Sequence, residues 1–166
     1  NLMTKKTVLG TANVGCEMRA DGLLVATREA APAGIFRLDG ATGEIVRFQN
    51  GNTNVGSIDI NSNSTSYNTS SDYRLKENVD YTWDATSRLK QLKPARFNFI
   101  ADADTTVDGF LAHEAATVVP EAVTGTKDEV DDNGDAVMQG IDQSKLVPLL
   151  VKTIQELEAR ITALEA

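Results

Sequence analysis

The stretch VPLLVKTIQELEARITALEA, residues 147–166, carries the clearest structural signal in the chain. Its apolar residues recur at alternating spacings of three and four, which is the pattern of an a/d heptad seam. The seam consists of Val147, Leu150, Ile154, Leu157, Ile161 and Leu164. It predicts a helix over about residues 145–166 that forms a coiled coil with other copies, and an amphipathic helix packed on its own domain is the alternative. Ser144 is the expected helix cap, and Pro148 falls in the first turn, where proline is tolerated.

The region before this helix mixes helical and strand patterns. Asp84 is a plausible N-cap for a helix over about residues 85–92, which Lys93-Pro94 would end. Residues 96–100 alternate as a strand does, with Phe97 and Phe99 on one face. Further elements are expected in this order: a strand at 109–113, helical turns at 114–119 before Pro120, and a hairpin of 122–130 with 136–141 closed by Asp132-Asn133-Gly134-Asp135.

Residues 1–60 predict short strands separated by turns. Apolar runs at 35–38, 45–48 and 55–60 are bounded by Gly, Asn and Asp, which is typical of strands and turns. Their apolar content is low, so a monomeric β-domain made from them would be marginal. We therefore expect a fibre in which three chains wrap around each other and share one core.

The polar run NSNSTSYNTS, residues 61–70, predicts an exposed linker between two domains. The N-terminal domain, residues 1–70, is then the β-rich end of a fibre together with its linker. Residues 71–166 form a second domain with helices and strands that ends in the coil. The predicted fold class is α+β.

Composition excludes several classes of protein. A net charge of −8 argues against sequence-independent binding of nucleic acid, which needs basic clusters. Cys16 is the only cysteine and His113 the only histidine, so no intrachain disulfide or multi-histidine metal site is expected. No apolar run is long enough to span a membrane. The chain begins Asn1-Leu2-Met3 without a charged and then apolar leader, so we expect no signal peptide and a fragment of a longer protein.

Two other patterns indicate structural roles. Residues 129–140 partly mimic a calcium loop, but Gly140 stands where a bidentate Glu is required, so a charged hairpin tip is preferred. His113 beside Glu114 is interpreted as a structural histidine next to an apolar strand, not as an acid/base pair. No metal or cofactor is expected.

The motif SDYRLK, residues 71–76, follows directly on the polar run. Here the chain resembles the C-terminal intramolecular chaperones of phage endosialidases, tailspikes and tail fibres, which are autocleaving serine peptidases. The family motif is Ser-Asp-x-Arg-Leu-Lys, and residues 71–76 match it at every fixed position. The resemblance continues in order through residues 94–97, 109–114, 120–125 and 144–150.

The resemblance implies a trimeric precursor that cuts itself once, between Ser70 and Ser71. Ser71 would be the nucleophile and Lys76 its base, because a serine hydroxyl needs activation and Ser-Lys pairs can supply it. Lysine acts as a base only when neutral, which burial or a nearby cation favours. Arg74 is close enough in sequence to supply that cation or to orient a carbonyl. In the plainer interpretation, Ser71-Asp72 only caps a turn, and Arg74 and Lys76 are solvated.

Three functions remain open at this point. The first is a chaperone that promotes trimeric folding of the fibre in cis and then releases itself by single-turnover autoproteolysis. It implies two further copies of the chain as partners and no nucleic acid or membrane. Assembly would occur in the host cytoplasm, after which the N-terminal part enters the virion tail. The second is a structural trimerisation module that never cuts, and the third is an adhesin whose N-terminal strands bind a host glycan. Ile at a and Leu at d by themselves favour two strands, whereas the resemblance implies three.

Overall fold

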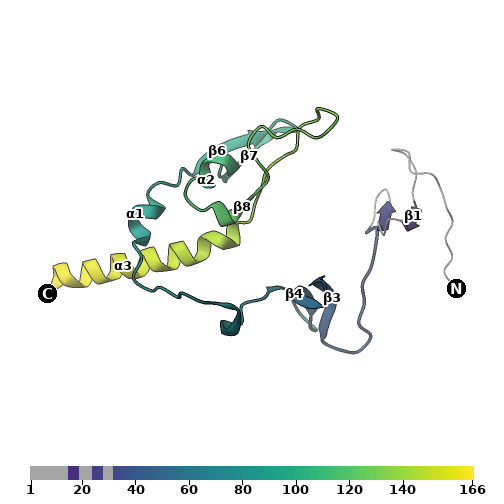
Figure 1. Ribbon diagram of the computed structural model, residues 1–166, viewed down its shortest axis with the longest axis horizontal. Helices are drawn as coiled ribbons and strands as arrows, with labels where there is room; N and C mark the ends of the chain where they lie inside the picture. The colour runs from purple at the N-terminus through teal and green to yellow at the C-terminus, as the bar shows by residue number, and fades with distance from the viewer. Residues whose placement is uncertain (1–14, 19–23, 28–31) are drawn as a thin grey trace. The chain divides into compact units, whose positions relative to one another are not determined.

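The computed structural model describes residues 15–18, 24–27 and 32–166 (Figure 1). These residues form both strands and helices, which confirms the α+β class. They divide into two compact units, Asn1–Asn78 and Val79–Ala166. Part of the strand prediction for residues 1–60, and the side chain of Cys16, lie outside the described residues. Among the described helices, none is both long and apolar enough to cross a membrane.

The first unit is built from antiparallel hairpins. β1 (Gly15–Met18) pairs with β2 (Leu24–Thr27). β3 (Gly43–Asn50) pairs with β4 (Thr53–Ile60), which confirms the strands predicted at 45–48 and 55–60. Gly51 sits in the connecting turn with a φ of 60°, a conformation that glycine adopts without steric cost.

Residues 61–70, predicted to be an exposed linker, are all exposed, but half of them form a strand that the prediction missed. β5 (Thr65–Thr69) pairs with β4, and Tyr67 lies opposite Ile58. The turn before it is closed by the Asn61 side chain, which accepts hydrogen bonds from the backbone N–H groups of Asn63 and Ser64. All five residues of β5 are exposed. Because neither face of this edge strand is buried, its sequence lacks the apolar alternation that reveals a strand.

The strand predicted at 35–38 is absent. Residues 32–38 have no regular secondary structure, and Ile35 and Phe36 are largely exposed. A strand needs a partner for its backbone N–H and C=O groups, and within the described residues none pairs with this run.

The second unit begins with a short helix and a hairpin. α1 (Ala85–Leu89) starts at Asp84, whose side chain accepts from the Ser87 N–H at 3.0 Å, so the predicted cap is confirmed. The helix ends about three residues before the predicted position. β6 (Ala95–Phe99) confirms the predicted strand and pairs with β7 (Asp102–Gly109). The rings of Phe97 and Phe99 meet edge to face, 5.3 Å apart.

The strand predicted at 109–113 is wrong, because β7 ends at Gly109 and α2 (Ala112–Ala115) follows almost at once. The apolar run there does not alternate across a sheet. Phe110 instead packs against the core of the unit. β7 itself is mostly polar, and an ion pair between Arg96 and Asp108 at 2.7 Å helps to hold it against β6.

The segment from Pro120 to Ile141 forms a long hairpin-like excursion. After the turn η2 (Pro120–Ala122), β8 (Val123–Thr124) pairs with β9 (Gly140–Ile141). A single bridge joins Val130 to Ala136 near the tip. The predicted pairing is therefore correct in its ends and tip, but its strands are only two residues long.

The C-terminal helix follows a 3₁₀ turn. η3 (Gln143–Leu146) leads into α3 (Val147–Glu165), with Pro148 in the first turn as predicted. Ser144 does not cap the helix. The Asp142 side chain instead accepts from the Ser144 N–H at 3.0 Å and from the Ser144 hydroxyl at 2.6 Å, so the cap belongs to η3.

The core of the second unit lies where α3 meets α1 and the loop after α2 (Figure 1). Its buried residues are Ala85, Val118, Val119, Ala122, Leu146 and Leu149. Arg88 ties α1 to that loop, since it donates to the Val118 carbonyl at 2.8 Å and stacks 5.9 Å from the centre of the Trp83 ring. In the first unit, by contrast, no side chain of residues 32–78 is fully buried.

Candidate self-cleavage site

The structure brings Ser71 and Lys76 together. The Lys76 Nζ lies 2.7 Å from the Ser71 Oγ and 3.0 Å from the Ser71 carbonyl oxygen. The cause is η1 (Tyr73–Leu75), a single 3₁₀ turn between the two residues. The Lys76 N–H donates to the Tyr73 carbonyl at 3.1 Å and closes that turn. A nucleophile and a candidate base are therefore within hydrogen-bond distance.

Asp72 organises this turn. Its Oδ1 accepts from the Arg74 N–H at 2.8 Å, which makes it the N-cap of η1. Its carboxylate also accepts hydrogen bonds from the Arg74 Nε at 2.9 Å and from the Arg74 Nη2 at 2.7 Å. These contacts from Arg74, first the side chain and then the backbone, hold the pKa of Asp72 below its ordinary value of 3.8, and the charge of Lys76 lowers it further.

The contacts with Asp72 fix the position of the Arg74 guanidinium, which was predicted to supply a cation or to orient a carbonyl. The guanidinium is bound in a bidentate pair within its own turn, and bidentate pairs fix orientation as well as adding energy. Two features of the plainer interpretation are present, the cap and the exposure of Arg74 and Lys76. They coexist with the contact between Lys76 and Ser71. The sequence predicted Asp72 only as a cap. Its pairing with the Arg74 guanidinium was not predicted, although both residues are fixed positions of the motif.

The residue before Ser71 is anchored to the sheet. The Ser70 N–H donates to the Val55 carbonyl at 3.2 Å, and its hydroxyl donates to the Asn54 carbonyl at 3.1 Å. Both acceptors lie on β4, so Ser70 extends the register of β5 by one residue. The carbonyl that would be attacked thus belongs to a residue held by backbone hydrogen bonds, while the turn that carries Lys76 follows it.

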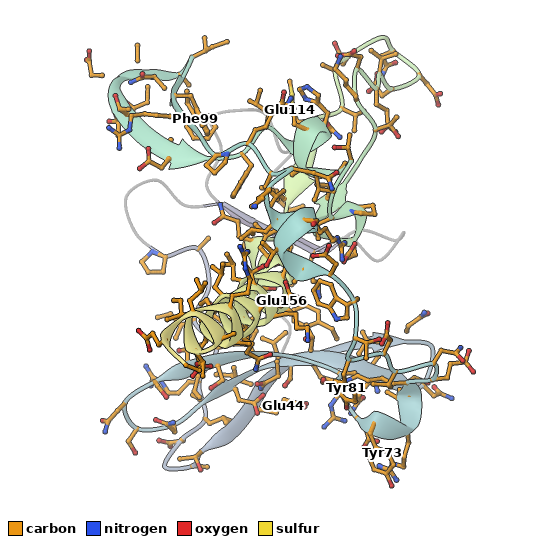
Figure 2. All side chains as sticks on the ribbon, turned by 90° about the vertical axis from the view of Figure 1, so that its left-hand side faces the viewer. Glu44, Tyr73, Tyr81, Phe99, Glu114 and Glu156 are labelled. Atoms are coloured by element: carbon orange, nitrogen blue, oxygen red, sulfur yellow. The ribbon has the colours of Figure 1, made fainter. Side chains whose placement is uncertain are left out.

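The whole segment is open to solvent. Every residue from Asn61 to Thr82 is exposed. Tyr73, which Figure 2 labels on η1, is 81% exposed, and Leu75, Val79 and Tyr81 are also exposed. A single chain therefore leaves Lys76 exposed, and the large apolar side chains that neighbour it in the sequence have no cover from the described residues.

The predicted heptad seam is also uncovered in the single chain. All six of its side chains are exposed, from 42% at Leu157 to 88% at Leu164. The face of α3 that packs on its own unit is a different one, with Leu149 and Thr153 buried. In the described residues, the packing of this helix on its own unit buries c and g positions. The a and d side chains stay partly exposed, although Val147 and Leu150 also line an apolar pocket with Leu89 and Phe110.

The other residues weighed from sequence lie elsewhere. His113 is half-buried on α2, next to the core residue Ala115. Glu114 forms an ion pair with Lys93 at 3.1 Å. At the hairpin tip, Asp131 accepts from the backbone N–H groups of Asn133 and Asp135, as a charged turn does.

Comparison with known families tests the resemblance. Residues 71–124, less than half of the chain, match the family model Peptidase_S74, described as chaperone of endosialidase. These residues are similar to that family. The match begins at Ser71 and includes Lys76. It supports a chaperone role for residues 71–124. No curated protein matches the chain.

Proposed function

We propose that residues 71–166 are an intramolecular chaperone that promotes trimeric folding of an attached phage tail fibre or tailspike and then releases itself. Release occurs by one self-cleavage, between Ser70 and Ser71, with Ser71 as nucleophile and Lys76 as base. The observation that carries the proposal is the 2.7 Å contact between the Lys76 Nζ and the Ser71 Oγ. The family match, which begins at Ser71, supports it.

The chemistry is an acyl shift followed by hydrolysis. A neutral Lys76 amine takes the Ser71 hydroxyl proton while the Ser71 Oγ attacks the Ser70 carbonyl carbon. The bond from that carbon to the Ser71 nitrogen breaks, and the nitrogen receives the proton from the Lys76 ammonium. Water then hydrolyses the ester on the Ser71 Oγ, which leaves a carboxylate on Ser70 and a free amine and hydroxyl on Ser71. Because the nucleophile becomes a new chain start, the reaction occurs once.

Assembly is the proposed trigger. Desolvation favours the neutral form of a lysine, and one chain leaves Lys76 exposed. In this proposal, association through the a/d seam of α3 lets other copies cover Lys76 and the exposed apolar residues that neighbour it in the sequence. Cleavage would then follow correct assembly and make it kinetically irreversible.

The first unit gives a reason for the trimer. Residues 32–78 bury no side chain fully, although β4 carries half-buried Ile58 and Ile60. Three such chains could share a core that one lacks. In this proposal assembly takes place in the host cytoplasm, the N-terminal region stays in the virion tail, and the chaperone is released.

A non-cleaving trimerisation module is the second candidate. The observation in its favour is that the Arg74 guanidinium is paired with Asp72 and that Lys76 is exposed. In that case the exposed seam would still assemble the fibre, and the chain would remain whole.

Substitution separates the two candidates. Ser71→Ala and Lys76→Ala should each give an uncut chain that still forms trimers, since neither side chain supports the core. Ser66→Ala is the matched control for the loss of a hydroxyl, because Ser66 lies on β5 four residues before the scissile bond. Lys90→Ala is the control for the charge. The controls should cut like the wild type on a denaturing gel. Cleavage at the same bond in either dyad variant would falsify the assignment, and an intact wild type would favour the structural module.

A further inference from the structure

A carboxylate on α3 caps the start of α1. The Glu156 Oε1 accepts from the Ala85 N–H at 3.0 Å, and its Oε2 accepts from the Thr86 N–H at 2.8 Å and the Thr86 hydroxyl at 2.5 Å. Figure 2 shows Glu156 on α3 beside α1. These hydrogen bonds hold the pKa of Glu156 below its ordinary value of 4.5. Two residues 70 positions apart are thus joined by charge-assisted hydrogen bonds.

The cap is complete only with this distant residue. The first N–H groups of a helix have no acceptor within the helix. In α1, Asp84 satisfies the Ser87 N–H, whereas Glu156 satisfies those of Ala85 and Thr86. Ala85 is fully buried against the core, so water would not easily replace the carboxylate there.

Lys152 makes a second contact one helical turn earlier. Its Nζ donates to the Tyr81 carbonyl at 2.9 Å. Residues four apart lie on the same face of a helix, so Lys152 and Glu156 together hold residues 81–86 along one face of α3. We call these two side chains the clamp.

The clamp and the seam occupy opposite faces of α3. With Ile154 at a and Leu157 at d, Lys152 falls at f and Glu156 at c, which are outer positions of a coiled coil. Helices that associate through the exposed seam would therefore leave the clamp intact. The outer face would carry residues 81–86, and the inner face would carry the other copies.

The clamp also limits where the reacting groups can go. Lys76 is five residues before Tyr81, so its Cα lies within about 18 Å of the Tyr81 Cα even in a fully extended chain. A fixed Tyr81 thus limits how far the backbone of Lys76 can move from the clamped segment.

We propose that Lys152 and Glu156 are positioning residues for the self-cleavage, so that assembly through the seam also limits how far along the chain the Ser71–Lys76 turn can move from α3. They touch neither reacting group and act through the chain that they hold. This inference rests on the proposed function. It assigns to the outer face of α3 the task of connecting oligomerisation to the chemistry.

The test compares cleavage rates in isolated trimers of the full chain. Glu156→Ala and Lys152→Met should cut at least about tenfold more slowly per trimer than the wild type, equal to about 1.4 kcal/mol in activation free energy. Lys152→Arg, which keeps a cationic donor, and Glu156→Gln, which keeps one acceptor oxygen, should restore part of the rate. Glu158→Gln removes an equal charge from the same helix and should cut normally.

Amide exchange gives the second measurement. In the Glu156→Ala trimer, the peptide covering residues 79–86 should exchange faster than in the wild type and in Glu158→Gln. Wild-type cleavage rates in both clamp variants, or slow cleavage with unchanged exchange, would overturn the inference. If Glu156→Ala does not assemble, Lys152→Met, which removes one hydrogen bond, is judged by the same criteria.

The proposed function fails in a different way. If the wild-type trimer itself does not cut, autoproteolysis is wrong, and so is any positioning role in it. If the wild type cuts, Ser71→Ala does not, and the clamp variants match the wild type, then only the positioning role is wrong.

Discussion

Replacing Ile154 by alanine should weaken assembly without unfolding the chain. Ile154 lies near the middle of the seam and is 65% exposed in the single chain. Alanine has a higher helix propensity than isoleucine, so α3 itself should persist. The change therefore isolates the contact that the seam is proposed to make with other copies.

The magnitude follows from the exposed fraction. Full burial of an isoleucine side chain contributes about 1.5–3 kcal/mol, so the part still exposed corresponds to about 1–2 kcal/mol per copy. Over three copies the loss is about 3–6 kcal/mol, which at about 1.4 kcal/mol per tenfold is a fall of about 10²–10⁴ in the trimer association constant.

Sedimentation equilibrium over a range of concentrations measures this constant. The background is Ser71→Ala, so that cleavage does not change the species. Gln155→Ala, at an exposed outer position b of the same helix, is the matched control and should assemble normally. Equal association constants for the two variants, with equal helix content by circular dichroism, would refute the seam as the interface.

Three further predictions concern stability. Leu149→Ala, at a side chain only 2% exposed, should lower the unfolding free energy by about 2–5 kcal/mol in urea, whereas Gln155→Ala should change it little. Acid should destabilise the second unit, because folding lowers the pKa values of Glu156 and Asp84. The stability that this contributes is complete above the ordinary pKa values of 4.5 and 3.8, and it is lost as the pH falls through the lower pKa values of the folded chain. Thermal midpoints between about pH 6 and pH 2 should fall less in Glu156→Gln, and an equal fall would contradict this. Gly56→Ala should weaken the pairing of β5 and Ser70 with β4, since the new Cβ would lie 2.6 Å from the Asn68 carbonyl oxygen. Gly34→Ala is the control, because its Cβ would meet no atom within 4 Å. The amides of β5 should exchange faster in Gly56→Ala than in Gly34→Ala.

Local signals in the sequence predicted much of the fold. The heptad spacing located α3, the apolar runs bounded by Gly, Asn and Asp located β3 and β4, and Asp84 marked the start of α1. Each of these features depends on residues close together in the chain. Pro148 was placed correctly for the same reason, because its tolerance in a first turn is a property of the helix end alone.

The two strands that were missed share a cause. β5 and β7 are mostly polar and mostly exposed, so no alternating apolar pattern marks them. Both are held by backbone pairing with a partner that propensity does not reveal. The apolar runs at 35–38 and 109–113 gave the opposite error, since each was predicted to be a strand and neither forms one. Apolar residues also occur where no strand forms.

In the candidate site too, some features could be predicted from the sequence and others could not. The closeness of Ser71 and Lys76 came from the resemblance, since a serine and a lysine five residues apart carry no signal by themselves. The structure adds the reason, which is the turn capped by Asp72. The contact of Glu156 with α1 joins residues far apart in the chain, and no local pattern could have indicated it.

The most direct test follows the wild-type chain as it assembles. Monomer and trimer fractions are separated over time, and the intact mass of each fragment is measured. The account predicts a fragment that begins at Ser71, produced in the trimer fraction and absent from dilute monomer. A fragment with a different first residue, or the same fragment released by monomers at the full rate, would contradict it.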